Sequence, residues 1–436
     1  MITAARQIRL NLNLQTAGRH DAAWKTQENT DHLAADADWY VRVAQLAEKG
    51  KLDAIFLADG HGSLGGESVR RPWRGLDPTV LLAAIAQKTE RIGLVSTVHA
   101  IYGHPFSVAR TIASLDHVSK GRAAWNIITS QNPPTLEALG VQEPLDPDTR
   151  YRKAEEFVEI VTGLWDSLPQ SAIVDDREQD LYIDTSQTHP VDYKGEFYTT
   201  KAVLPLPGGH AGRPVLFQAG ASDRSRAFGG KWADALFTGQ RTKELARSFS
   251  AHVKAIASSH GRDPDKLVVL PGLFVILGGT EAAAQQRKDQ LDALLDAEYL
   301  KERLADQLGL PVSDLMLDAE LPYDKLAASD AADTLQARHR EQLTTEARTR
   351  HLTVRQLLFN NLSGGHRVIV GTPEQVADDI IDWVDSGASD GFNINIDVQT
   401  EGLEQFIDGV VGELQHRGRF RRNYEYETLR ENLGVA

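Results

Sequence analysis

The chain contains no cysteine among its 436 residues and only 2 methionines. The absence of cysteine excludes disulfide bonds, thiolate metal ligands and a cysteine nucleophile, and it is compatible with a cytoplasmic protein. Any redox chemistry must therefore depend on a bound cofactor. The chain also lacks an apolar run of about 18 residues and a basic N-terminal segment followed by an apolar stretch, so we expect neither a membrane span nor export.

The chain also has fewer basic than acidic residues. The 47 Lys and Arg residues face 61 Asp and Glu residues, which gives a formal net charge of -14 at pH 7. Nucleic acids and anionic membranes both favour clustered Lys and Arg, so we expect neither as the main partner. The sequence also lacks a G-x-x-x-x-G-K-[ST] loop, a G-x-S-x-G nucleophile turn and a G-x-G-x-x-G fingerprint after its first strand. Without a nicotinamide-binding domain of its own, a redox enzyme would need reducing equivalents from outside.

Short apolar or β-branched runs alternate with longer amphipathic stretches along the chain, which is typical of βα units on a parallel sheet. Eight such strands separated by helices predict a (β/α)8 barrel, in the α/β class, with insertions. The expected strands are 8–15, 53–59, 92–99, 122–129, 214–220, 235–239, 267–278 and 390–397, and the expected helices are 36–50, 76–90, 106–119, 151–167, 242–261, 281–308 and 372–387.

Two stretches break this alternation. Residues 168–213 are rich in Asp, Gln, Thr, Pro and Gly, which predicts irregular structure with short hairpins. Residues 309–365 carry polar, helical sequence and could form a small cap over the barrel mouth. We therefore expect residues 1–436 to form a single barrel domain with insertions at about 168–213 and 309–365.

Polar residues follow several of the expected strands, where the reactive groups of such barrels lie. Asp59 follows the buried run LDAIFLA, so its carboxylate could orient a cofactor ring, accept a proton, cap a helix or pair with a loop cation. The segment QAGASDRS places Gly220 and then Ser222 where a helix should begin, a favourable arrangement for binding a phosphate. Ser222 or Asp223 could equally well only cap that helix.

Four histidines, His20, His61, His99 and His104, invite a metal hypothesis. Metal-binding amidohydrolase barrels use a paired His-x-His on the first strand, whereas the first strand here reads LNLNLQ. We therefore expect no catalytic metal, and histidines that are satisfied within the fold or line a substrate site.

Seven segments in order resemble the flavin-dependent monooxygenases of the bacterial-luciferase type, a family typified by nitrilotriacetate monooxygenase component A, dibenzothiophene-sulfone monooxygenase and the pristinamycin IIA synthase large subunit. The likeness spans nearly the whole chain. The segments are LDAIFLAD (52–59), GLDPTVLLAAIAQKTERIGLVSTV (75–98), HPFSVARTIASLDHVSKGRAAWNIITS (104–130), RYRKAEEFVEIVTGLWDS (150–167), YKGEFY (193–198), PVLFQAGASDRSRAF (214–228) and GTPEQVADDIIDWVDSGASDGFNI (371–394).

The resemblance implies a TIM (β/α)8 barrel of the bacterial-luciferase type with FMN lying across its mouth. It implies that Asp59, Thr97 and Asn126 meet the isoalloxazine or ribityl region, and that Tyr151, Ser222 and Ser225 hold the phosphate. The catalytic candidates are His99, His104 and Asp59, and the candidates for lining the substrate side are His99, Tyr102, His104, Trp73 and Trp24.

The sequence departs from the family pattern at one position. The family usually has a histidine three residues before the Arg-Tyr pair, and Pro147 stands here in that position. A polar group near the flavin is therefore missing, so a proton donor cannot be assigned by analogy at this point.

The resemblance further implies an activity and its partners. A separate NAD(P)H:flavin reductase would supply FMNH2, and dioxygen would oxygenate a small organic substrate through a flavin C4a-(hydro)peroxide, with the insertions acting as lids. We expect a homo-oligomer, either a dimer or a tetramer.

Two alternatives stay open at this point, F420-dependent hydride transfer on the same barrel and a flavin-binding protein without turnover. The substrate is also open. Arg70, Arg71 and Arg74 could form a basic pocket for a polycarboxylate or simply a solvated charge cluster.

Overall fold

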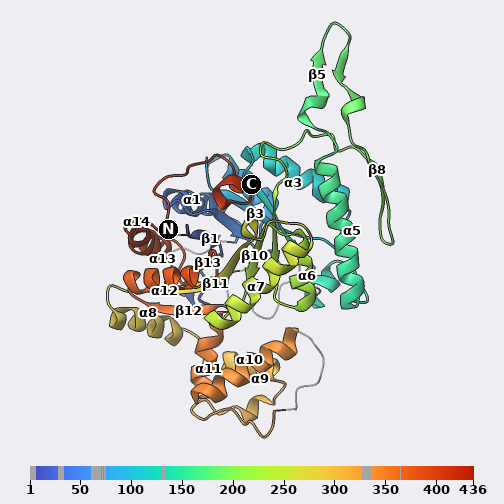
Figure 1. The fold of residues 1–436 in the computed structure, drawn as a ribbon. Helices are drawn as coiled ribbons and strands as arrows, with labels where there is room; N and C mark the ends of the chain where they lie inside the picture. Colours follow the sequence, from blue (N-terminus) through green and yellow to red (C-terminus); the bar gives the residue numbers. More distant parts are fainter. Residues whose placement is uncertain are drawn as a thin grey trace.

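The computed structural model of the protein describes residues 6–27, 34–59, 70, 72, 75–129, 131, 133–326, 335–363 and 365–436, with the backbone alone for residues 335–339, 342 and 363. Within these ranges the chain forms a barrel, a projecting pair of hairpins and a separate group of helices (Figure 1).

Eight parallel strands close the barrel, as the sequence predicted. Neighbours in the sheet follow chain order, and the last strand pairs with the first to complete the circle. This closed parallel sheet surrounded by helices confirms the TIM-barrel fold. The strands are β1 (Arg9–Asn13), β2 (Ala54–Leu57), β3 (Gly93–His99), β4 (Ala123–Ile128), β9 (Val215–Ala219), β10 (Ala235–Thr238), β11 (Val268–Leu277) and β13 (Gly391–Ile396).

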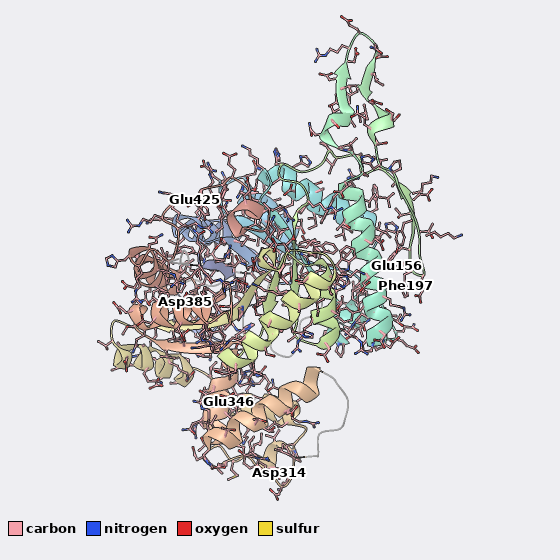
Figure 2. The ribbon with its side chains drawn as sticks, viewed as in Figure 1. Glu156, Phe197, Asp314, Glu346, Asp385 and Glu425 are labelled. Carbon is pink, nitrogen blue, oxygen red and sulfur yellow. The ribbon has the colours of Figure 1, made fainter. Side chains whose placement is uncertain are left out.

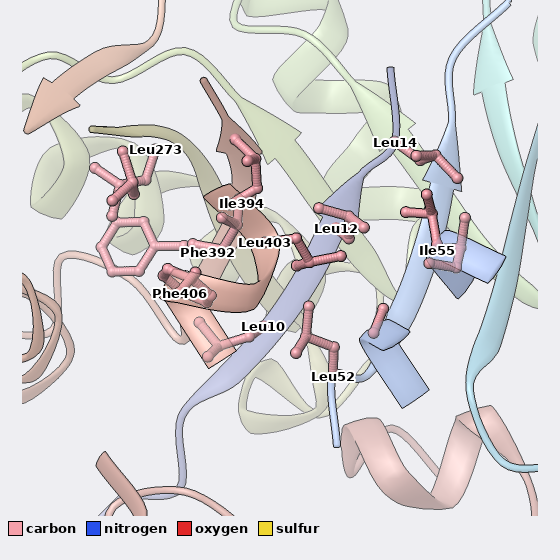
Figure 3. Close-up of a cluster of buried hydrophobic side chains, with 14 of the residues drawn as sticks. Leu10, Leu12, Leu14, Leu52, Ile55, Leu273, Phe392, Ile394, Leu403 and Phe406 are labelled. Atoms are coloured by element: carbon pink, nitrogen blue, oxygen red, sulfur yellow. The ribbon is translucent and has the colours of Figure 1, made fainter. Parts of the chain in front are cut away.

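The hydrophobic core has two layers, one between the strands and the surrounding helices and one inside the barrel. In β1, Leu10 and Leu12 face the surrounding helices, where they pack with Ile55 and Phe392 (Figure 3). The intervening residues of the strands fill the barrel, where Phe56 belongs to a second cluster. Because strand side chains alternate in direction, one run of sequence supplies both layers. Burial of each large apolar side chain contributes roughly 1.5–3 kcal/mol.

The outer helices begin at capped residues, which explains why most of their starts were readable from the sequence; the start expected at 151 is wrong, because α5 begins at Pro147 after the cap Asp146. Asp77, for example, accepts hydrogen bonds from the backbone of Thr79 and Val80 immediately before Pro78 opens its helix. The helices around the barrel are α1 (Ala37–Lys49), α2 (Pro78–Ala86), α3 (Pro105–Ser119), α5 (Pro147–Trp165), α6 (Asp223–Trp232), α7 (Lys243–Ser259), α8 (Glu281–Ala293) and α12 (Pro373–Asp385).

The C-terminal segment closes the end of the barrel where the strands begin. Leu429 and Leu433 of α15 (Leu429–Leu433) pack in the same cluster as Phe56 and other side chains of the barrel interior. A Cβ on Gly93 would lie 2.4 Å from a methyl carbon of Leu429, so glycine is needed where this helix meets β3. We therefore expect a site at the opposite end, where the strands finish.

Among the described residues, the barrel sheet carries one additional strand that was not predicted. β12 (Arg367–Gly371) pairs with β11, which is ten residues long and changes partner along its length. The first four residues of β11, from Val268, pair with β10, and the stretch from Leu273 to Leu277 pairs with β12. The barrel wall therefore has a seam between β10 and β11 at its mouth.

The helix expected over 281–308 is wrong in one respect, because the structure divides it into α8 and α9 (Ala297–Leu308). Asp296 accepts hydrogen bonds from the backbone N–H groups of Glu298 and Tyr299 and so caps a new helix. The second helix packs with α10 (Leu335–Arg350) and α11 (Val354–Asn360) around a core of its own that includes Leu304 and Leu357. We call residues 295–326 and 335–362 the helical layer; it lies at the barrel mouth (Figure 1).

Residues 168–213, which we call the hairpin arm, form two antiparallel hairpins. β5 (Ile173–Asp176) pairs with β6 (Leu181–Ile183), and β7 (Val191–Lys194) pairs with β8 (Thr199–Ala202). The first hairpin extends away from the barrel (Figure 1), so it does not cover the mouth as a lid would. The second lies along α5, where Figure 2 labels Glu156 on the helix and Phe197 at the hairpin turn.

Candidate functional site

Two of the expected cofactor residues meet at the mouth of the barrel. Thr97 of β3 and Asn126 of β4 are opposite each other in register, and the Asn126 side-chain amide donates to Thr97 Oγ1 at 2.9 Å. Both are nearly buried, with 3% and 2% of their surface exposed. Asn126 Oδ1 has no hydrogen-bond partner among the described residues. A buried oxygen left in this way costs about 1–3 kcal/mol, so the pair fits a ligand that donates an N–H or O–H group.

Asparagines continue this polar layer on the neighbouring strands. Asn13 of β1 donates to Asn395 Oδ1 of β13 at 2.8 Å, and Asn13 Oδ1 is buried without a partner within the described part of the chain. Asp59 lies two residues beyond β2 and is half-buried; the last residue of β2, Leu57, pairs with Ser96 of β3. The mouth therefore presents a carboxylate and several amides around one opening.

The turn before α6 has the form expected for a phosphate site and also for a helix cap. Ser222 accepts a hydrogen bond from the Ser225 backbone at 3.1 Å, so it does cap the helix. Ser225 is 2% exposed and its hydroxyl accepts from the Gln218 side chain at 2.7 Å, so it lies beneath the turn. A Cβ on Gly220, at φ +155°, would lie 2.1 Å from Ser225 Oγ, which requires glycine there.

Tyr151 approaches this turn from α5. Its half-buried ring packs edge-on against Phe228 of α6, with 5.8 Å between ring centroids. An ion pair between Arg224 and Asp148 also joins the first turns of the two helices. Two helix N-termini, which carry partial positive charge, therefore lie side by side.

Arg150 was missed as a site residue, although the Arg-Tyr pair was the signal that could have found it. Its guanidinium lies 5.5 Å from the Tyr151 ring centroid, and its Nε is buried with no hydrogen-bond partner in the portion of the chain described. A guanidinium in the first turns of α5 suits a phosphate bound there, because it adds charge-assisted hydrogen bonds.

Among the histidine and aromatic candidates, His99 and Tyr102 lie together at the end of β3, whereas His104 and Trp24 lie elsewhere. His99 ends β3, is nearly buried and lies against Tyr102, with 5.1 Å between ring centroids. His104 is exposed, and its Nδ1 accepts from the Phe106 backbone at 3.2 Å, so it caps α3. Trp24 is half-buried after β1, against the outer core. His61, Trp73, Arg71 and Arg74 lie outside the described residues.

Pro147 is explained by the start of α5. It is the first residue of the helix, after Asp146, which accepts hydrogen bonds from the backbone of Asp148 and Thr149. A proline suits this position because its fixed backbone angle is already helical. The protein therefore has a helix-starting residue where the family pattern has a polar one.

His366 is a second residue that the sequence did not reveal. It precedes β12, and its ring stacks on Phe237 of β10 with 5.2 Å between centroids. A Cβ on Gly272 of β11 would lie 2.2 Å from its Nδ1, so the ring fills the seam in the barrel wall. Burial, helped by Arg19 and Arg241, lowers the pKa of His366 to about 3 and keeps the ring neutral. The signal that could have found it is the short apolar run RVIVG after two glycines.

The described residues form neither a metal site nor a membrane-spanning helix. No group of three His, Asp or Glu side chains in the described ranges is arranged to hold a metal ion. Among the helices that the structure describes, none is long and apolar enough to cross a membrane.

Comparison with known proteins identifies the family. Residues 16–390 match the model of the luciferase-like monooxygenases. The chain belongs to this family. It is 38% identical to N-acetyl-S-(2-succino)cysteine monooxygenase of Bacillus subtilis (strain 168), over 100% of this chain and 98% of that protein. It is 36% identical to nitrilotriacetate monooxygenase component A of Aminobacter aminovorans, over 99% of this chain and 97% of that protein.

Comparison with solved structures supports the same family assignment. The EDTA monooxygenase of a Chelativorans species superposes on this luciferase-like monooxygenase with a TM-score of 0.82 and 32% identity, over 99% of each chain. Two F420-dependent enzymes reach TM-scores of only 0.57 and 0.56 at 14% identity, which shows a shared fold alone. The predicted family and enzyme class are therefore confirmed, and the monooxygenase interpretation is favoured over the F420 alternative.

Proposed function

We propose that this luciferase-like monooxygenase binds reduced FMN, supplied by a separate NAD(P)H-dependent flavin reductase, and uses it with dioxygen to oxygenate a small organic substrate. The observation that carries the proposal is the arrangement of the mouth, where a buried, unsatisfied amide oxygen of Asn126 and two adjoining helix N-termini occupy the same end of one barrel.

Each end of this arrangement suits one part of the flavin. Asn126 Oδ1 would accept a hydrogen bond from the ring or ribityl chain, with Thr97 fixing the orientation of the amide. Tyr151, Ser222 and Arg150 would hold the phosphate at the start of α6, while Ser225 would support the turn through Gln218. Asp59 would meet the ring from β2. When bound, reduced FMN supplies the electrons that activate dioxygen, and the protein orients it and excludes water.

The relatives support the cofactor and the two-component organisation. A structure of riboflavin lyase with modified FMN superposes with a TM-score of 0.83 at 28% identity. Pristinamycin IIA synthase consists of separately named subunits A and B, and the nitrilotriacetate enzyme is called component A. The proposal includes a homo-oligomer, either a dimer or a tetramer, which light scattering of the purified protein would measure.

An anaerobic titration with FMNH2 tests the cofactor. We expect saturable binding to the wild-type protein, and binding at least about tenfold weaker in Tyr151→Phe and Arg150→Gln, because each change removes a hydrogen bond to a charged group. Ser186→Ala, an exposed change on the hairpin arm, serves as the control and should bind FMNH2 like the wild type.

The same titration with reduced F420 separates the alternatives. Saturable binding of F420 with none of FMNH2 would contradict the proposal and return the protein to hydride transfer. Tight FMNH2 binding without substrate-dependent oxygen uptake, when a flavin reductase and a panel of organic acids and thioethers are present, would indicate a flavin-binding protein without turnover.

A further inference from the structure

Three polar atoms at the barrel mouth are buried without a hydrogen-bond partner among the described residues. They are Tyr102 Oη in the loop after β3, Gln131 Nε2 after β4 and Arg150 Nε in the first turns of α5. β3 and β4 end in register, with His99 opposite Ile128, so the loops that follow them leave the barrel at the same edge. Buried polar groups are normally satisfied, so this group of donors indicates a ligand with an acceptor oxygen.

The Tyr102 hydroxyl is the centre of this group, because both neighbouring side chains act on it. Burial raises the pKa of the Tyr102 hydroxyl, and the Gln131 amide and the Arg150 charge offset only part of that rise. The hydroxyl therefore keeps its proton at neutral pH and can donate a hydrogen bond. The Gln131 amide approaches without a well-aligned hydrogen bond, so the hydroxyl proton stays available to a ligand.

The ring that carries this hydroxyl is held from two sides. It lies beside the ring of His99, with 5.1 Å between centroids, and it packs against the outer cluster that includes Trp125 and Phe157. A ring fixed in this way presents its hydroxyl in one direction. His104, two residues further along, has no such freedom to serve the mouth, because its side chain caps α3.

This donor lies where the family pattern has lost one. Pro147 occupies the position at which the family usually carries a histidine, and as the first residue of α5 it offers the mouth no polar side chain. Arg150 follows one helical turn later, and its charge acts on the Tyr102 hydroxyl. The loop after β3 therefore brings a polar group to the end of α5 at which the histidine is missing.

We propose that the Tyr102 hydroxyl, oriented by the Gln131 amide, is the hydrogen-bond donor that replaces the missing histidine and holds reduced oxygen at the mouth until the substrate reacts. The inference rests on the proposed function, which supplies FMNH2 and dioxygen. In the productive reaction FMNH2, dioxygen and substrate give FMN, oxygenated substrate and water, whereas without substrate FMNH2 and dioxygen give FMN and hydrogen peroxide. The hydroxyl gives up no proton in either reaction, so it changes only how long the reduced oxygen is retained.

Release of hydrogen peroxide in the absence of substrate tests the inference. Protein loaded anaerobically with FMNH2 is mixed with oxygenated buffer, and hydrogen peroxide is followed with time. We expect release to be at least about tenfold faster in Tyr102→Phe, which keeps the ring and removes only the hydroxyl, and about threefold faster in Gln131→Leu. Tyr193→Phe, which removes a hydroxyl from the hairpin arm, is the matched control and should behave like the wild type. Wild-type rates in both mouth variants would overturn the inference.

A spectroscopic measurement without flavin checks the donor itself. In protein labelled with 3-fluorotyrosine, the ¹⁹F signal that is absent from Tyr102→Phe belongs to Tyr102. We expect this group to ionise at higher pH than free 3-fluorotyrosine, because burial raises the pKa of the Tyr102 hydroxyl. Gln131→Leu should move the ionisation to still higher pH, since the amide lowers that pKa. Ionisation at or below the pH of the free amino acid would overturn the assignment of a protected donor.

Flavin affinities separate this inference from the proposed function. We expect Tyr102→Phe to bind FMNH2 and reduced riboflavin each within about twofold of the wild type. Weakened binding of FMNH2 alone would show that the hydroxyl serves the phosphate, which would overturn the inference and leave the proposed function standing. If the wild type binds no FMNH2, the proposed function fails and the inference fails with it.

Discussion

Asp116 illustrates how a single buried group sets the response of this protein to pH. It lies near the end of α3 and is 3% exposed. Burial raises its pKa to about 6, because the backbone N–H of Ala123 and the nearby charges of His117 and Arg430 offset only part of the desolvation. A carboxyl with a raised pKa binds its proton more tightly in the folded state than in the unfolded state. Its contribution to stability is therefore complete below about pH 4 and is lost as the pH rises through about 6.

Replacing Asp116 with Asn removes this dependence. We expect Asp116→Asn to gain stability relative to the wild type as the pH rises from 4 to 7, by up to about 3 kcal/mol, because no buried carboxylate then has to ionise. Urea denaturation across this pH range measures the difference. Asp223→Asn, an exposed change at the start of α6, should follow the wild type, and a pH-independent effect of Asp116→Asn would contradict the explanation.

At the residue scale, the sequence predicted some of the candidate site and not the rest. Thr97 and Asn126 do meet, because neighbouring parallel strands bring their ends together. The inward position of Ser225 depends on a hydrogen bond from Gln218, which no local pattern encodes. His366 contacts Phe237 from more than a hundred residues away, and this contact arises only after β12 has paired with β11.

At the scale of elements, Glu156 shows how α5 holds the second hairpin of the arm. Its carboxylate accepts hydrogen bonds from three successive backbone N–H groups in the hairpin turn, those of Glu196, Phe197 and Tyr198, at 2.7, 3.0 and 3.2 Å. A Cβ on Gly195 would lie 2.3 Å from this carboxylate, so glycine allows the close approach. The motif YKGEFY (193–198) thus forms the hairpin turn that Glu156 binds.

We expect Glu156→Gln to loosen this turn without unfolding the barrel. An amide has only one acceptor oxygen, so the change leaves some of the three N–H groups unsatisfied. Hydrogen exchange at residues 196–198 should accelerate at least about tenfold, with little change in the midpoint of global unfolding. Glu159→Gln on the same helix, which affects only a contact with the Tyr193 hydroxyl, is the matched control. Equal protection in both variants would show that other contacts hold the hairpin.

The elements that the sequence missed are those without a strong local signal. Nearly every residue of the barrel strands is buried, and all eight strands were predicted. Four of the five residues of β12 are only half-buried, so its pattern is weak. The break between α8 and α9 depends on Asp296 acting as a cap within a stretch whose composition favours continuous helix.

At the scale of the whole molecule, a buried ion pair joins the C-terminal segment to the start of the second barrel strand. Asp53, which precedes β2, pairs with Arg421 of the C-terminal segment, and both side chains are almost fully buried. Asp53 also accepts from the Leu10 backbone at 2.6 Å, and the Tyr424 hydroxyl donates to the Leu52 carbonyl at 2.6 Å. These contacts fix the segment that carries Leu429 into the end of the barrel.

Arg421→Met should destabilise the whole barrel by about 3–5 kcal/mol, because it leaves the Asp53 carboxylate buried without its partner. The double change Asp53→Asn with Arg421→Met should cost less than the single change, since no uncompensated charge remains. Chemical denaturation at pH 7 measures both. The neighbouring exposed Arg422→Met is the control and should be near neutral. A double variant less stable than the single one would contradict this account.

The pairing of β11 with β12 has a consequence for how such proteins can be rearranged. The chain leaves β11 at Leu277 and enters β12, the neighbouring strand outside the barrel, at Arg367, so the 89 residues between them are attached at adjacent points and can be treated as a cassette. Exchanging this cassette between homologues would leave strands β1 to β9 untouched. The segment can thus be replaced at two fixed junctions while the closed circle of barrel strands is kept.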